Sequence, residues 1–186
     1  MVYNIIMRVI SGKYKGRKLV APKNDTRPTL DRAKETLFNM LGNLDGTTVL
    51  DLFAGSGQVA LECLSRGAER AVMCDNGKDA FAAITENFAK VGEKPELFRC
   101  EYVQCLRSLA STPAKFDLVY VDPPYHAGYY ADVLRLLCDL DLVAQDGIIV
   151  CEHPVDIAIE QPCDGLNQIK QRKVGSIMFD FYQKTE

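Results

Sequence analysis

Apolar runs alternate with helical patterns along the chain from Thr47 onward. Five runs are continuously apolar and rich in β-branched residues, as in strands buried on both faces of a sheet. The strands predicted from them are 48–52, 71–75, 96–100, 116–121 and 147–151. Between these runs apolar residues recur at helical spacing, and the predicted helices are 58–66, 78–91, 103–109 and 129–140. The alternation predicts βαβ units and a mostly parallel sheet, which is an α/β fold.

The two ends of the chain depart from this alternation. Residues 166–173 and 176–182, joined at Gly175, are predicted to be two antiparallel strands that close the sheet. Ahead of the first strand, apolar residues at helical spacing predict a helix over residues 27–41, with Thr29 as its N-cap. No repeat, low-complexity stretch or linker divides the chain. We therefore expect residues 1–186 to form a single domain.

Length and composition narrow the class of protein. A chain of 186 residues buries roughly 70% of its unfolded surface without help from metals or disulfides. The seven cysteines form no C-x-x-C pair, so we expect buried free thiols. No apolar run approaches the roughly 20 residues that span a bilayer, and the first ten residues lack the pattern of a secretory signal. These features predict a cytoplasmic protein that is not bound to a membrane.

Charge is distributed unevenly along the chain. The net charge is −3, yet residues 1–34 contain nine basic side chains and only two carboxylates. A cationic stretch attracts the phosphates of a nucleic-acid backbone, although a basic run is often only a solvated surface. The basic residues that we expect to contact RNA are Arg8, Lys13, Lys15, Arg17, Lys18, Arg27 and Arg32.

A glycine-rich turn follows the first predicted strand directly. In a doubly wound sheet this turn is where ligands bind, because glycine lets the backbone approach closely. Asp75 ends the next predicted strand, where a carboxylate can accept both ribose hydroxyls of an adenosine. The pattern predicts a nucleoside-type cofactor. Its expected contacts in this part of the chain are Asp51, Phe53, Ala54, Gly55, Ser56, Gly57 and Asp75.

The spacing Gly55-x-Gly57-x-x-Ala60 also satisfies the dinucleotide fingerprint, so by itself it does not separate NAD from S-adenosylmethionine. A carboxylate at Asp51 would repel a pyrophosphate and attract the cationic methionine end of S-adenosylmethionine, which favours the methyl donor. Glu101 and Tyr102 follow the third predicted strand and could contact the adenine. They could equally be the start of a solvated helix.

The buried strand over residues 116–121 ends in Asp122-Pro123-Pro124-Tyr125. An exocyclic amine on a base is a poor nucleophile because its lone pair is delocalised into the ring. The Asp122 carboxylate and the Pro123 carbonyl, in a turn stiffened by two prolines, can hold both amine protons and aim the lone pair at a methyl group beside Asp122. Tyr125 would stack on the flipped-out base. We predict these four residues to be catalytic; the alternative is a strand ended by prolines with a surface tyrosine.

Four segments together resemble the RsmD-type bacterial 16S ribosomal RNA guanine-N2 methyltransferases. The basic block and the Arg-Pro-Thr helix are the more specific of them, while the other two are common to many amino-methyltransferases. The segments are Met7-Arg8-Val9-Ile10-Ser11-Gly12-Lys13-Tyr14-Lys15-Gly16-Arg17-Lys18-Leu19, Thr26-Arg27-Pro28-Thr29 with Asp31-Arg32 and Glu35-Thr36-Leu37-Phe38-Asn39, Asp51-Leu52-Phe53-Ala54-Gly55-Ser56-Gly57, and Asp122-Pro123-Pro124-Tyr125.

The resemblance implies a Rossmann-like class I methyltransferase with a seven-stranded sheet and S-adenosylmethionine as methyl donor. It implies a target in the small ribosomal subunit or its assembly intermediate, namely the N2 amine of one guanine of 16S ribosomal RNA, guanine 966. Residues 1–26 would form a basic β-hairpin facing the RNA, and residues 27–186 the catalytic core. We expect a monomer without a metal. The chain departs from the family in starting six residues before Met7 and in having Asp75 where glutamate is more frequent.

Three other functions fit parts of the sequence. An Asp-Pro-Pro-Tyr motif serves the N6 amine of adenine in DNA or RNA equally well. An NAD-binding oxidoreductase would use the same glycine turn, but the sequence offers no candidate site for hydride transfer. A non-catalytic nucleic-acid-binding module would retain the fold alone.

Overall fold

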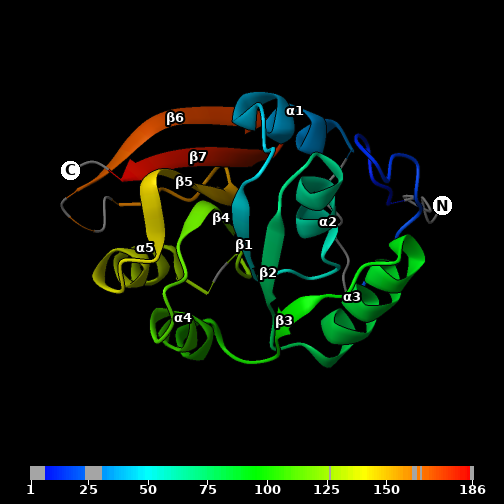
Figure 1. Ribbon diagram of the computed structural model, residues 1–186. Helices are drawn as coiled ribbons and strands as arrows, with labels where there is room; N and C mark the ends of the chain where they lie inside the picture. Colours follow the sequence, from blue (N-terminus) through cyan, green and yellow to red (C-terminus); the bar gives the residue numbers. More distant parts are fainter. Residues whose placement is uncertain (1–6, 24–30, 126, 161–162, 164, 185–186) are drawn as a thin grey trace.

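The computed structural model describes residues 7–23, 31–125, 127–160, 163 and 165–184, and its centre is one seven-stranded sheet (Figure 1). The strand order is β3-β2-β1-β4-β5-β7-β6. The first five strands in that order are parallel, and β7 runs antiparallel to both of its neighbours. The strands are β1 (Thr48–Leu52), β2 (Arg70–Cys74), β3 (Glu96–Phe98), β4 (Phe116–Val121), β5 (Val143–Pro154), β6 (Leu166–Val174) and β7 (Ile177–Lys184).

Helices cover both faces of the sheet (Figure 1). They are α1 (Asp31–Leu41), α2 (Gln58–Ser65), α3 (Lys78–Val91), α4 (Tyr102–Ala110) and α5 (Tyr130–Asp139). One buried cluster joins the sheet to α1, α2, α3 and the first described segment, and a second joins it to α4 and α5. Successive residues of a strand point to opposite faces; Val49 accordingly lies in the first cluster and Leu50 in the second.

The predicted elements are all present, and their ends differ by a few residues. The predicted bounds of β1, β4 and α3 match the observed ones, and the C-terminal antiparallel pair is confirmed, with Gly175 in the turn at φ 64°. β5 begins four residues before the prediction, because Phe116 pairs with Val143 across an irregularity in its register with β4. Within the described residues α1 begins at Asp31; Arg27 and the predicted N-cap Thr29 lie outside them.

The basic block is not a regular β-hairpin. Residues 7–19 fold back on themselves, but Arg8 and Lys18 form only an isolated antiparallel bridge. The backbone hydrogen bonds of this bridge run from Leu19 N to Met7 O and from Val9 N to Arg17 O, and one more, from Gly16 N to Val9 O, also holds the two arms together. The reason is visible in the packing: the turn between the arms gives its hydrogen bonds to α2 instead of extending the ladder.

The structure also describes the cysteines and the apolar character of the helices. All seven cysteines are free; four are buried, whereas Cys100, Cys138 and Cys163 are only partly buried. Among the described residues, no helix has the length and apolar character that crossing a membrane requires.

Candidate active site

A cavity of about 380 Å³ opens where β1, β2, β3 and β4 end. This size is ordinary for a small-molecule site, and the carboxyl edge of an open α/β sheet is where such sites form. The cavity is lined by Phe53, Gly55, Cys74, Asp75, Asn76, Cys100, Glu101, Tyr102, Asp122, Pro123, Pro124, Tyr125 and Tyr129. The residues after four different strands therefore share one space.

Asp75 organises the glycine turn. Its Oδ2 accepts a hydrogen bond of 2.8 Å from Gly55 N, and its Oδ1 accepts one of 2.8 Å from Gly77 N. The carboxylate thus holds the loop after β1 against the loop after β2 while lining the cavity. Each oxygen keeps lone-pair capacity for a further donor such as a ribose hydroxyl.

The glycine turn requires left-handed backbone at three positions. Phe53 has φ 71°, Gly55 has φ 55° and Gly57 has φ 71°. A Cβ at Gly57 would also lie 3.2 Å from both Ile84 and Phe88. Only glycine avoids both the strain and the crowding there. Gly57 therefore serves the turn and its packing on α3, and it is not part of the cavity wall.

Asp51 lies away from the cavity, contrary to the role expected from the sequence. Its side chain is 1% exposed, and Oδ2 accepts a hydrogen bond of 3.1 Å from Ala60 N in the first turn of α2. Burial raises the pKa of Asp51 to about 7. Because side chains alternate along β1, Asp51 faces α2 as Val49 does. A carboxyl group with this pKa is a weaker reason for preferring a cationic cofactor to a pyrophosphate.

Of the other residues expected around the glycine turn, some line the cavity and some are buried beside it. Phe53 and Gly55 line the cavity, whereas Ala54 and Ser56 are buried beside it. Ser56 Oγ lies 3.7 Å from Met7 Sδ, and Ser56 O accepts a hydrogen bond of 2.9 Å from Asn87 Nδ2. These residues hold the turn in place from behind the cavity wall.

Three aromatic rings pack together at the wall formed after β1 and β3. Phe53 and Tyr129 are nearly parallel, with centroids 6.1 Å apart, and Tyr102 is tilted against both. The Tyr102 hydroxyl donates a hydrogen bond of 2.8 Å to Asp132 Oδ2. Burial, together with that hydrogen bond, raises the pKa of Tyr102 to about 12. The phenol remains neutral at physiological pH and gives an apolar ring face to the cavity.

Glu101 and Tyr102 both line the cavity, as the nucleoside interpretation expects. Four lining residues were not identified from the sequence: Cys74, Asn76, Cys100 and Tyr129. Asn76 and Cys100 are adjacent in the chain to the predicted residues Asp75 and Glu101, and this adjacency could have indicated them. In the structure Asn76 Nδ2 donates a hydrogen bond of 2.6 Å to Glu101 Oε1. Tyr129 reaches the cavity only because α5 packs beside α4, which no local pattern reveals.

The Asp-Pro-Pro-Tyr turn forms the opposite wall. Asp122, Pro123, Pro124 and Tyr125 all line the cavity. The turn closes with a hydrogen bond of 2.9 Å from Ala127 N to Pro124 O. The structure therefore brings together the two motifs that the sequence separates by more than sixty residues.

Buried polar side chains support this turn from behind. The Tyr120 hydroxyl hydrogen-bonds to the Glu152 carboxylate, and the Tyr130 hydroxyl donates to Glu152 O at 2.9 Å. Burial and the nearby Asp122 carboxylate raise the pKa of Tyr130. Asp122 and Glu152 thus create a negative field at this end of the cavity, which suits an electron-poor amine. Glu152 was not identified from the sequence.

Only one of the two histidines lies within the described residues. His126 lies outside the described residues. His153 is buried, with Nε2 3.1 Å from Asp180 Oδ2. Burial acts against the charged ring, but hydrogen bonds to Asp180 and to the Pro154 carbonyl raise the pKa of His153. It does not line the cavity.

The basic block of residues 7–19, called the basic segment below, is anchored to α2 through its backbone. Ile10 N and Ser11 N donate to the two oxygens of the buried Glu62 carboxylate at 2.8 and 3.0 Å, and Lys13 N donates to Ser65 O at 2.8 Å. Gly12 approaches α2 so closely that a Cβ would lie 1.7 Å from Ser65 O. The segment therefore has a fixed position beside α2, whose first turn follows the glycine loop.

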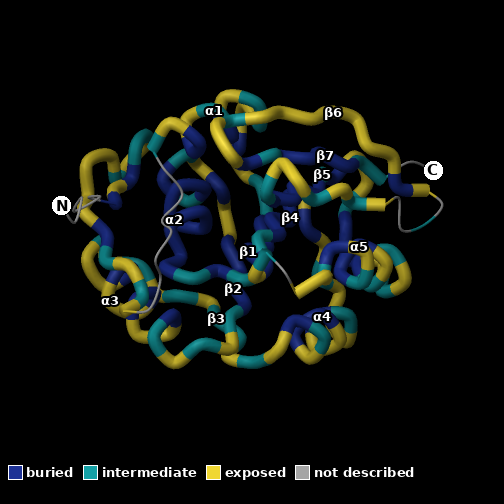
Figure 2. The backbone as a smooth tube through the Cα atoms, turned by 180° about the vertical axis from the view of Figure 1, so that it is seen from behind, coloured by how far each residue is buried: buried dark blue, intermediate teal, exposed yellow. Residues whose placement is uncertain are grey.

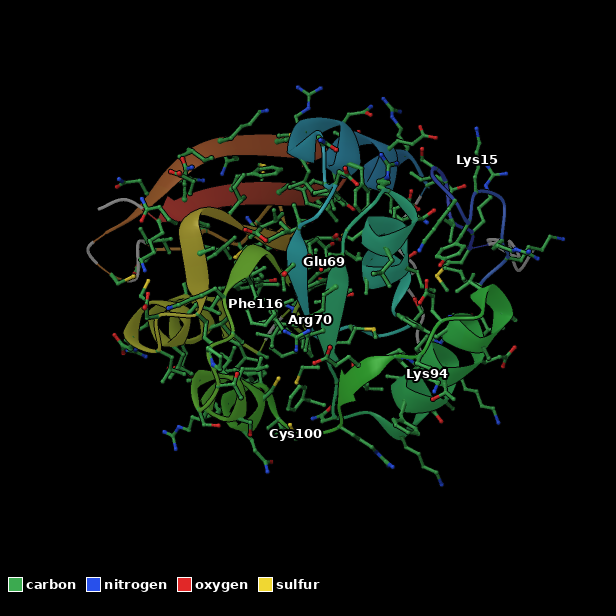
Figure 3. The ribbon with its side chains drawn as sticks, in the orientation of Figure 1. Lys15, Glu69, Arg70, Lys94, Cys100 and Phe116 are labelled. Atoms are coloured by element: carbon green, nitrogen blue, oxygen red, sulfur yellow. The ribbon has the colours of Figure 1, made fainter. Side chains whose placement is uncertain are left out.

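The basic side chains of this segment differ in their surroundings. Arg8 Nε lies 2.9 Å from Asp31 Oδ2, and Lys13 Nζ lies 3.1 Å from Glu93 Oε1, both at the surface. Lys15, Arg17, Lys18 and Arg32 are exposed, and Lys15 extends away from the body of the protein (Figure 3). Arg27 lies outside the described residues.

Known proteins are similar to this chain over almost its whole length. The family model described as Conserved hypothetical protein 95 matches residues 7–183. The Bacillus subtilis "Putative rRNA methyltransferase YlbH" is 34% identical over 182 residues, covering 96% of this chain and 99% of its own. The Escherichia coli "Ribosomal RNA small subunit methyltransferase D" is 31% identical over 180 residues, covering 96% and 90%.

Solved structures agree on the fold. The "Putative methyltransferase yhhF" from Escherichia coli superposes with a TM-score of 0.81 at 29% identity, covering 97% of this chain and 98% of its own. "SMU.776, a putative methyltransferase complexed with SAH" has a TM-score of 0.70 at 14% identity, covering 84% of this chain and 50% of its own; this likeness concerns the fold alone. The fold is that of class I methyltransferases, and the chain belongs to the Conserved hypothetical protein 95 family, the RsmD-type family that its motifs resemble.

Proposed function

We propose that this protein transfers a methyl group from S-adenosylmethionine to the exocyclic N2 amine of a guanine in 16S ribosomal RNA, acting as a monomer on the small subunit or its assembly intermediate. The observation that carries the proposal is that Asp75 and the Asp122-Pro123-Pro124-Tyr125 turn line one cavity. Direct methyl transfer needs a nucleoside site and a site for a base amine within one cavity. The names of the relatives support ribosomal RNA as the substrate.

The donor would occupy the half of the cavity between β1 and β3. Asp75 is the group suited to the ribose hydroxyls, and the rings of Phe53, Tyr102 and Tyr129 suit the flat adenine. The polar pair Asn76 and Glu101 is suited to the adenine amine. S-adenosylmethionine supplies an activated methyl group on a sulfonium; the protein orients it toward the opposite wall.

The acceptor base would lie against Tyr125, with its amine between the Asp122 carboxylate and the Pro123 carbonyl. Two acceptors fix both protons and direct the nitrogen lone pair at the methyl group. As the nitrogen–carbon bond forms, the carbon–sulfur bond breaks and its electron pair returns to sulfur. The nitrogen then releases one proton, which the Asp122 carboxylate is placed to accept. No covalent intermediate with the protein is required.

The basic segment would hold the RNA. Its position beside α2, fixed by Glu62 and Ser65, gives Lys15, Arg17 and Lys18 a defined place beside that helix. Cations held in a fixed arrangement bind phosphates and so position the substrate without reading its sequence. Residues 1–26 would then be the RNA-facing part and residues 27–186 the catalytic core.

The test is methyl transfer from radiolabelled S-adenosylmethionine to small ribosomal subunits lacking the modification, followed by mass spectrometry of the digested RNA. N2-methylguanosine is the expected product. N6-methyladenosine would instead support the adenine enzyme, which the Asp-Pro-Pro-Tyr turn serves equally well. Binding of the donor by calorimetry without transfer would support a non-catalytic module, and binding of NAD but not of the donor would support an oxidoreductase.

A further inference from the structure

The outermost strand of the sheet, β6, is strongly basic and lies open to solvent. Between Leu166 and Val174 it contains Lys170, Arg172 and Lys173 and no carboxylate. Every residue from 167 to 173 is exposed, and the strand follows one border of the molecule (Figure 2). Within the described part of the chain, none of the three cations forms an ion pair. This charge is separate in sequence from the amino-terminal basic segment.

A register shift decides which cations share a face. The pairing of β6 with β7 shifts between Gln168 and Lys170, so that Lys170 pairs with Phe181 and Arg172 with Phe179. Both phenylalanines belong to the buried cluster under α1 and α2, and directly paired residues point to the same face. Lys170 and Arg172 therefore lie together on the α1 side of the sheet.

The neighbouring cation provides an internal contrast. Lys173 pairs with Met178, one residue out of phase with Arg172, and so points to the opposite face. Gln171 shares that face and donates a hydrogen bond of 2.7 Å to Asp180 Oδ1. Two adjacent residues of like charge and exposure thus face in opposite directions.

The pairing pattern also places Arg172 relative to the catalytic turn. Arg172 pairs with Phe179, which pairs with Glu152 on β5, and the preceding residue of β5 pairs with Val121 of β4. Arg172 is therefore level with Asp122, the residue after Val121. Three strand spacings separate them, which amounts to roughly 14 Å. An RNA strand whose base occupies the cavity can reach this distance with its flanking phosphates.

The same face continues into the basic segment. α1 lies between the end of β6 and the first described residues in both views (Figures 1 and 2). Arg32 of α1 is exposed, and so are Lys15 and Arg17 of the amino-terminal segment. α1 also has one exposed acidic residue, Glu35. Cations thus follow one border of the molecule from β6 across α1 to the amino-terminal segment.

We propose that Lys170 and Arg172 bind backbone phosphates of the RNA that flanks the target nucleotide, so that the substrate lies along β6 and α1 as well as on the amino-terminal segment. This inference rests on the proposed function. The simpler explanation of a basic edge strand is protection against edge-to-edge association. That explanation makes no distinction between the two faces, whereas phosphate binding on the α1 side does.

The experiment compares R172Q with K173Q, and both with the double variant K170Q/R172Q. Binding to small subunits lacking the modification, and to a 16S ribosomal RNA transcript, is measured as a function of salt concentration. Each lost phosphate contact lowers the magnitude of the slope of log K against log salt by about 0.7 to 0.9. We expect that loss for R172Q, about twice that loss for the double variant, and no loss for K173Q. In turnover, KM for the subunits should rise several-fold for the double variant while kcat stays unchanged.

Donor affinity and the thermal midpoint serve as controls, and both should be equal in all variants because the changes are exposed and polar. An equal slope for wild type and K170Q/R172Q would overturn the inference, and so would equal losses for R172Q and K173Q. Those outcomes leave the proposed function intact if wild-type protein methylates the subunits. If wild-type protein neither binds nor methylates them, the proposed function fails and this inference fails with it.

Discussion

The two halves of the cavity are built in different ways. On the donor side, Asp75 accepts hydrogen bonds from two backbone amides and thereby fixes two loops. On the acceptor side, consecutive prolines remove amide donors, and the supporting Glu152 lies among buried hydroxyl groups. The donor side is therefore held by the same carboxylate that we propose to bind the ribose. The acceptor side is supported by residues behind it, and Asp122 is the carboxylate that we propose to hold the substrate amine.

This difference predicts that one carboxylate governs turnover and the other governs donor binding. Asp122→Ala should lower the single-turnover rate of methyl transfer by about 10²- to 10³-fold, because one preorganised electrostatic partner is lost. The calorimetric donor affinity of the same variant should stay close to that of wild type. A near-normal single-turnover rate would show that the turn is only a scaffold.

Asp75→Ala should have the complementary effect. We expect donor binding to weaken by about 1.5 to 3 kcal/mol, the range for lost charge-assisted hydrogen bonds. Part of this loss would come from the loops at Gly55 and Gly77, so Asp75→Asn is the useful comparison. Asp75→Asn retains one oxygen acceptor, so its donor affinity should lie between those of wild type and Asp75→Ala. Calorimetry checks both variants, and an unchanged dissociation constant for Asp75→Ala would remove this residue from the donor site.

The comparison extends to Asp51, the carboxyl group buried behind the donor side. Its pKa is raised to about 7 from 3.8, so the folded state binds more protons than the unfolded state between those values. Stability should therefore fall as pH rises from about 4 to 7, by at most roughly 1.4 kcal/mol per pH unit from this group. In urea unfolding, Asp51→Asn should reduce this decline. An identical pH dependence in the variant would show that Asp51 titrates normally.

The smallest effect is expected at the basic segment. Lys15→Gln with Arg17→Gln should reduce the salt slope of RNA binding by about 1.4 to 1.8 and leave donor affinity unchanged. Lys13→Gln is the matched comparison, because the hydrogen bonds of Lys13 to Tyr14 and Glu93 raise its pKa and occupy its ammonium. We expect Lys13→Gln to change the slope less than either single substitution. Unchanged binding by the double variant would make the segment a solvated surface.

The order of the elements and the position of the Asp-Pro-Pro-Tyr turn at the end of a buried strand could be predicted because each depends on local pattern. Continuous apolar runs such as 116–121 have few alternatives to a buried strand, and Asp122-Pro123-Pro124-Tyr125 is read directly from the chain. The sequence treats the glycine turn as one unit, whereas the structure separates Phe53 in the cavity wall from Asp51 beside α2. β1 ends at Leu52, and the left-handed backbone of Phe53 (φ 71°) breaks the alternation of the strand, so Phe53 reaches the cavity although Asp51, two residues earlier, faces α2.

The sequence alone determined the α/β class, the antiparallel C-terminal pair and the positions at which strands deliver polar residues to the carboxyl edge, because hydrophobic periodicity and turn chemistry are local properties. Tertiary structure alone decided which residues share a space. Tyr129 enters the cavity through the packing of α5, and Glu152 supports the turn through the pairing of β5 with β4. The face occupied by Lys170 and Arg172 was set by a register shift in β6. Such shifts depend on the fit between strands far apart in the chain, and one residue more or less reverses every side chain that follows.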